Sequence, residues 1–112
     1  MLQRALQEKG SIGALFTPGP ARTSLGGAIS QLRNFAPSEQ TRGFRTFLSH
    51  PDEKSACKRW LMLMRWMVRR HPPDLGIWTH LSPADLLIPV DVHVHRIAQL
   101  IGLTQREQAD WK

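Results

Sequence analysis

The chain is short of cysteine, of long apolar runs and of acidic residues. Among its 112 residues only Cys57 is a cysteine, which excludes an internal disulfide and a cysteine cluster within the chain. The most apolar run, residues 60–68, already contains Arg65 and is far shorter than the roughly 20 residues of a membrane span. The first residues also lack an apolar stretch of signal-peptide length. We therefore expect a cytoplasmic protein with no membrane partner.

The shortage of acids gives the chain a strongly basic balance. It has 15 Lys and Arg against 9 Asp and Glu, a net charge of +6. Residues 54–73 contain six Lys or Arg and no acid. Four of these cations form what we call the arginine stripe: Arg59, Arg65, Arg69 and Arg70. Such a balance favours a polyanionic partner, most often nucleic acid, although the solvated face of an amphipathic helix has the same pattern.

Apolar residues recur at helical spacing in the two strongest segments of the chain. In residues 23–35 the spacing aligns Leu25, Ile29 and Leu32, with Thr23 or Ser24 as the expected cap. In residues 55–70 the aligned residues are Trp60, Leu61, Met64, Met67 and Val68. Together with helices over residues 1–9 and 91–101, this pattern predicts an all-α fold.

The end of the sequence bears on domain organisation. Residues 104–107, Thr-Gln-Arg-Glu, match the capping box that opens a helix. Only a short stretch follows, up to Lys112. We expect residues 1–112 to form a single α-helical domain, truncated at one or both ends.

Residues 88–99 hold the candidate functional residues and allow three interpretations. If the segment is a helix, Asp91 stands at its positive end and shares a face with His95. If residues 88–95 are a strand, Asp91, His93 and His95 share one face in a pattern typical of metal ligands. In the third interpretation, Asp91 is only a helix cap and the histidines are ordinary surface residues.

A family resemblance adds to these interpretations. Residues 89–93, Pro-Val-Asp-Val-His, and the Arg-Ile-Ala at 96–98 resemble the Pro-Val-Asp-x-His element of the helix-hairpin-helix (HhH-GPD) DNA glycosylases. Most of the chain is also similar to an uncharacterised bacterial family related to that superfamily; the matching segments are residues 10–16, 55–59, 65–69, 74–78 and on to 103, and 109–112.

The resemblance implies a fragment of a glycosylase-like helical domain that binds double-stranded DNA and excises a damaged or modified base. It makes Asp91 the catalytic carboxylate. It implies a phosphate contact for His93, and no cofactor or metal. The basic charge pattern adds Arg65, Arg69 and Arg96 as expected DNA contacts. The lysine that bifunctional members place after the hairpin is missing from residues 71–76, as is the hairpin itself. Because an archaeal branch of 8-oxoguanine glycosylases is similar in carrying its lysine on an earlier helix, Lys58 becomes the candidate nucleophile for a lyase step. A covalent sugar intermediate needs the amine and the carboxylate beside one carbon, so we expect Lys58 and Asp91 to lie on facing helices with their side chains in one shared cleft.

Two other functions remain open from the residues. The missing hairpin and lysine favour a non-enzymatic nucleic-acid-binding module of the same fold, in which Lys58 is a solvated surface lysine. The strand interpretation favours a metal-dependent hydrolase that uses Asp91, His93 and His95.

Overall fold

The computed structural model describes residues 1–108, and this range contains helices but no β-strand. The α-helices are α1 (Leu2–Lys9), α2 (Ala21–Asn34), α3 (Arg42–Phe47), α4 (Lys58–Val68) and α5 (Val92–Leu100). Three short 3-10 helices lie between them: η1 (Gly13–Leu15), η2 (Pro51–Glu53) and η3 (Pro83–Asp85). The predicted all-α class is confirmed for these residues. None of the described helices combines the length and apolarity that a membrane crossing requires.

The core lies between α2 and α4, on the faces that the apolar spacing predicts. Leu25, Ile29 and Leu32 are fully buried on α2. On α4 the buried residues are Trp60, Leu61, Met64 and Val68, whereas Met67 is only partly buried. Burial of these aliphatic and aromatic surfaces is the main term that stabilises the fold.

An aromatic cluster joins the N-terminal segment to this core. The ring centroid of Phe16 lies 4.8 Å from that of Trp78 and 6.2 Å from that of Trp60. The Trp60 indole N–H donates to the backbone oxygen of Phe47 at 2.6 Å, so its one polar atom is satisfied inside the core. Trp60 is therefore a core residue that also fixes the end of α3 against α4.

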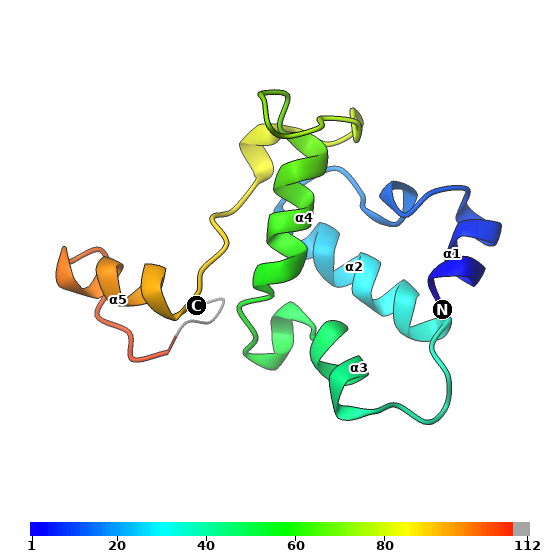
Figure 1. Cartoon of the computed structure of the whole chain (residues 1–112), viewed down its shortest axis with the longest axis horizontal. Coiled ribbons are helices and arrows are strands. Elements are labelled where there is room, and N and C mark those ends of the chain that lie inside the picture. Colours follow the sequence, from blue (N-terminus) through cyan, green and yellow to red (C-terminus); the bar gives the residue numbers. More distant parts are fainter. Residues whose placement is uncertain (109–112) are drawn as a thin grey trace.

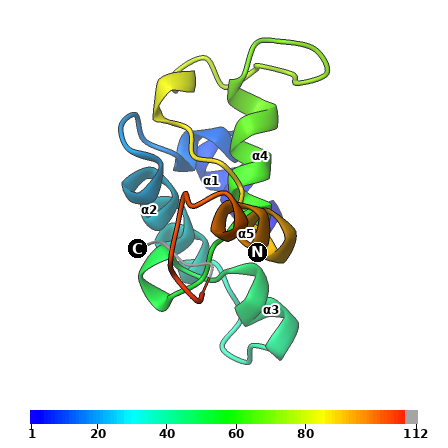
Figure 2. The same cartoon turned by 90° about the vertical axis from the view of Figure 1, so that its left-hand side faces the viewer.

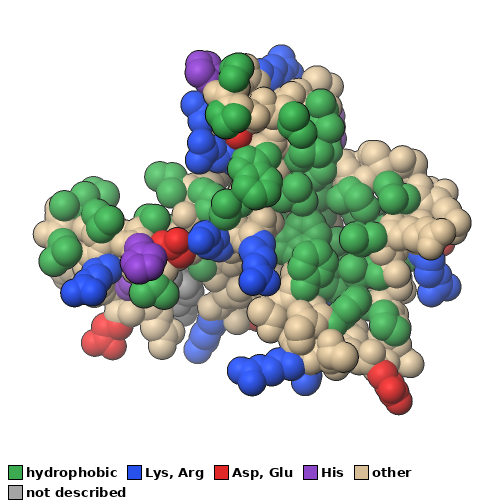
Figure 3. Space-filling view, in the orientation of Figure 1, with side chains coloured by type: hydrophobic (Ala, Val, Ile, Leu, Met, Phe, Trp, Pro, Cys, Tyr) green, Lys and Arg blue, Asp and Glu red, His purple; other side chains and the backbone are tan. Residues whose placement is uncertain are grey.

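Helix α5 stands apart from the other helices (Figures 1 and 2). An extended segment carries the chain away from η3, and α5 lies on the opposite side of α4 from α1, α2 and α3. None of its residues is buried, and Val92 and Leu100 are 77% and 78% exposed. Aliphatic side chains accordingly cover much of its surface (Figure 3).

Three boundary predictions are wrong, each for a local reason. Helix α2 begins at Ala21 behind Pro20, so neither Thr23 nor Ser24 caps it, and Ser24 is buried. Helix α4 begins at Lys58 because Cys57 adopts a left-handed conformation, with φ of 48°, which ends the preceding loop. The capping box at residues 104–107 opens no helix up to residue 108; the remainder of that prediction falls on residues 109–112, outside the described range.

Candidate active site at the starts of helices α4 and α5

Asp91 is the N-cap of α5. Its backbone is extended, and its Oδ1 accepts a hydrogen bond from the Val94 amide at 2.9 Å. The preceding Pro89 and the apolar residues that follow dictate this helix start. The helix predicted over residues 91–101 is confirmed, and the strand predicted as an alternative for residues 88–95 is wrong.

Lys58 occupies the first position of α4. The turn before it is held by the Ser55 hydroxyl, which accepts from the Cys57 amide at 3.2 Å. No side chain caps this helix, and its first turn contains no acid. The Lys58 side chain thus leaves α4 at its N-terminal end, toward the start of α5.

The two residues meet although 33 positions separate them. Lys58 Nζ donates to Asp91 Oδ2 at 2.8 Å, and the two side chains are 42% and 30% exposed, respectively. The pair therefore remains open to solvent and to a ligand. The hydrogen bond from Lys58, with a smaller effect of the Val94 amide, lowers the pKa of Asp91 from 3.8 to about 2. Asp91 is ionised at neutral pH.

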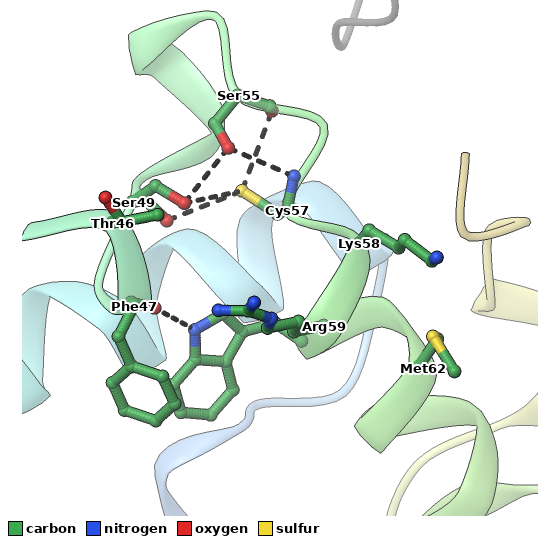
Figure 4. Close-up of a pocket in the computed structure, with 9 residues that line it drawn as sticks. Thr46, Phe47, Ser49, Ser55, Cys57, Lys58, Arg59 and Met62 are labelled. Atoms are coloured by element: carbon green, nitrogen blue, oxygen red, sulfur yellow. Dashed lines mark hydrogen bonds between the residues drawn. The ribbon is translucent and has the colours of Figure 1, made fainter. Parts of the chain in front are cut away.

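A cavity opens on the α3 side of Lys58 (Figure 4). Its volume is about 460 Å³, and it is lined by Thr46, Phe47, Ser49, Ser55, Cys57, Lys58, Arg59, Trp60 and Met62. Asp91 is not among the lining residues, and Figure 4 shows Lys58 pointing away from Cys57. The sequence predicts one shared cleft for Lys58 and Asp91; the structure brings the two groups into contact, but only Lys58 of the pair lines this cavity.

The other residues predicted on α5 are not drawn into this contact. His93 and Arg96 are exposed. The His95 side chain is partly buried, and its Nε2 has no hydrogen-bond partner within the described range. No three His, Cys, Asp or Glu side chains in residues 1–108 are grouped as metal ligands, so the ligand face that the strand interpretation requires does not form.

Arg65 and Arg69 share an acidic partner that the sequence pattern does not reveal. Each places a guanidinium nitrogen 3.5 Å from Asp74 Oδ2, and the Asp74 side chain is only 3% exposed. The loop after α4 turns back and donates from the Leu75 and Trp78 amides to the carbonyls of Trp66 and Met67. The expectation of an acid-free arginine stripe is therefore wrong at these two residues, because Asp74 lies just outside the acid-free window and folds back onto it.

Protonation of Asp91 provides a direct test of the ion pair. Because its pKa is lowered in the folded state, the stability it contributes is fully present above the unfolded value of 3.8 and is lost as the pH falls through about 2. A carbon-detected NMR titration of the Asp91 carboxyl should give a midpoint near 2. Lys58→Gln should move that midpoint toward 3.8, and Lys9→Gln on α1 should leave it unchanged. A midpoint still near 2 in Lys58→Gln would contradict the assigned cause.

Comparison with known proteins gives a family but no activity. Neither a curated protein nor a solved structure matches the chain. One family, described as protein of unknown function (DUF2400), matches residues 1–112. The match spans the helical core, the Lys58–Asp91 contact and the cavity beside it. The chain belongs to this DUF2400 family.

Proposed function

We propose that this protein is a DNA-binding N-glycosylase in which Lys58 and Asp91 act on the sugar of a damaged or modified nucleotide. The observation that carries the proposal is the 2.8 Å contact between Lys58 Nζ and Asp91 Oδ2. A covalent sugar intermediate needs an amine and a carboxylate beside the same carbon. The contact places these two groups together at solvent-accessible helix ends.

The proposed reaction begins with the base flipped out of the DNA stack. The Lys58 amine, after losing its proton, attacks the sugar C1′. The bond between C1′ and the base nitrogen breaks, and the base departs with the electron pair and takes up a proton. The C1′–O4′ bond then breaks, O4′ keeps the electron pair and takes up the proton that the nitrogen releases, and a protonated Schiff base joins C1′ to Lys58 Nζ. The ionised Asp91 stabilises the positive charge that develops on the sugar.

Borohydride reduction tests this assignment because it converts a Schiff base into a permanent bond between protein and DNA. Wild-type protein should be trapped on a duplex that contains an abasic site, and Lys58→Gln should not be trapped. If neither protein forms an adduct although both bind the duplex, the lyase step is wrong.

A non-enzymatic nucleic-acid-binding module is the second candidate. It is favoured by the isolation of α5, which has no buried residue. In the described range, the Lys58–Asp91 ion pair is the one that joins residues 1–81 to α5 and its N-cap. In this role the pair is a tether that positions α5, and the protein binds DNA without turnover.

Both candidates require a DNA-binding surface, for which the exposed charges of α4 and α5 are suited. Arg65 on α4 and Arg69 at its C-cap present cations, and His93 and Arg96 are exposed on α5. Phosphate contacts release counterions, so binding should weaken steeply with salt. The negative charge of Asp74 offsets one of the two arginine charges. Arg65 and Arg69 should therefore contribute less to the salt dependence than two unpaired arginines would.

Replacing both arginines by glutamine should flatten the salt dependence of duplex binding. Glutamine keeps a hydrogen-bond donor for Asp74 while removing two charges. The slope of log affinity against log salt should fall by about 2 or less, since each lost phosphate contact removes about 1. Fluorescence anisotropy with a labelled duplex measures the slope.

The matched control is Arg42→Gln with Arg45→Gln on α3, which removes the same net charge from another exposed site. An equal flattening in both double variants would show that only net charge matters. An unchanged slope in the α4 variant would make Arg65 and Arg69 solvated surface residues.

A further inference from the structure

The cavity between α3 and the start of α4 has a positive charge balance. Two of its lining residues, Lys58 and Arg59, are cationic, and none is acidic. Its volume of about 460 Å³ falls within the roughly 300–1,000 Å³ of small-molecule sites. It is larger than a single bound ion needs.

Arg59 is the cation available to a ligand in this cavity. Lys58 is occupied by Asp91, whereas Arg59 has no carboxylate within ion-pair distance in the part of the chain that the structure describes. In Figure 4 the Arg59 guanidinium reaches back toward α3, while Lys58 points the other way. Guanidinium groups suit phosphate oxygens because their planar N–H groups bind two oxygens at once.

The same cavity is lined by a short relay of hydroxyl groups, those of Ser49 and Ser55. Ser55 Oγ donates to Ser49 Oγ at 3.0 Å. The Ser49 hydroxyl lies 4.0 Å from the Cys57 sulfur, a weak contact in which either atom can donate. The Cys57 thiol itself donates to the backbone oxygens of Ser49 and Ser55, at 3.4 and 3.6 Å. The Ser49 hydroxyl hydrogen at the end of the relay can therefore be donated in a hydrogen bond to an anionic oxygen.

We propose that this cavity binds the phosphate of a deoxynucleotide, between Arg59 and the Ser49 hydroxyl. The apolar part of the lining, Phe47 and Met62, leaves room for the group that the phosphate carries. That the ligand is a phosphate rests on the cavity alone. That the phosphate belongs to a deoxynucleotide rests on the proposed function. The deoxynucleotide is either free or a unit of a DNA strand.

Amide NMR of the whole chain tests the site with four probes: inorganic phosphate, deoxyadenosine monophosphate, deoxyadenosine and a thymidine trinucleotide. The first two and the trinucleotide should shift the Ser49, Ser55 and Arg59 amides, and deoxyadenosine should not. A lower dissociation constant for the trinucleotide than for the monophosphate assigns a strand as the source, and the reverse order assigns a free nucleotide.

Arg59→Gln should weaken binding of the monophosphate by about tenfold or more, the loss of a charge-assisted contact. Arg4→Gln on α1, also exposed, should leave it unchanged. Equal shifts with deoxyadenosine, or no shift with any probe, would overturn the proposal. If phosphate binds but no borohydride adduct forms, the glycosylase proposal fails and the cavity proposal stands. If an adduct forms but phosphate does not bind, the cavity proposal fails and the glycosylase proposal stands.

Discussion

Wild-type protein should form a covalent adduct with duplexes that carry an abasic site or 8-oxoguanine when borohydride is present, and Lys58→Gln should abolish it. The amine is then missing, and within residues 1–108 no other lysine is held against Asp91. Asp91→Asn should slow adduct formation by about 10²–10³-fold, because the sugar cation loses a preorganised charge. Denaturing gel electrophoresis of a labelled duplex measures the adduct.

Lys58→Arg separates the chemical role from the tethering role. Arginine keeps the positive charge opposite Asp91 but has no amine that loses its proton at neutral pH. We expect Lys58→Arg to bind the duplex normally and to form no adduct. Lys54→Gln, an exposed lysine four positions earlier, is the matched control and should be trapped like wild type. Full trapping of Lys58→Gln would refute the nucleophile assignment.

Gly13→Ala should destabilise the protein by about 1–3 kcal/mol, the usual cost of forcing an extra methyl into a packed site. A Cβ at Gly13 would lie 2.6 Å from Trp78 Nε1 and 2.8 Å from Cδ1. The indole has little freedom to move away because it packs on Phe16. The Gly13 backbone is also held in place, since His80 Nε2 donates to the Gly13 carbonyl at 2.9 Å. Urea unfolding followed by tryptophan fluorescence measures the change.

The same substitution at Gly27 should have the opposite effect. Gly27 is exposed in the middle of α2, and nothing lies within 4 Å of an added Cβ. Alanine there should stabilise the helix by about 0.5–1 kcal/mol, because glycine has the greater backbone entropy to lose. Equal destabilisation at both positions would show that the contact with Trp78 is not the cause of the Gly13 effect.

The sequence predicts the parts of the fold that depend on neighbouring residues. The spacing of Leu25, Ile29 and Leu32 identifies the buried face of α2, and Asp91 marks the start of α5. The chemistry of a sugar intermediate predicts that Lys58 and Asp91 lie together, and the 2.8 Å contact agrees with that prediction. Their roles in catalysis remain predictions.

Features that depend on distant parts of the chain were not predictable from local patterns. Asp74 reaches Arg65 and Arg69 only because the loop after α4 reverses direction. The cavity beside Arg59 forms where α3, the Ser49–Ser55 hydroxyls and α4 converge. No spacing rule relates these segments, and tertiary packing alone determines their distances.

The exposure of α5 has a consequence for any partner that binds at Asp91. An isolated helix shorter than about 12 residues is only marginally populated in water, and α5 has nine residues, none of them buried. Its amides should exchange with solvent much faster than those of α2. The cap geometry of Asp91 exists only in molecules whose α5 is ordered. A partner that requires this geometry binds only the molecules in which α5 is ordered. Its measured dissociation constant is therefore the intrinsic constant divided by the fraction of molecules with an ordered α5.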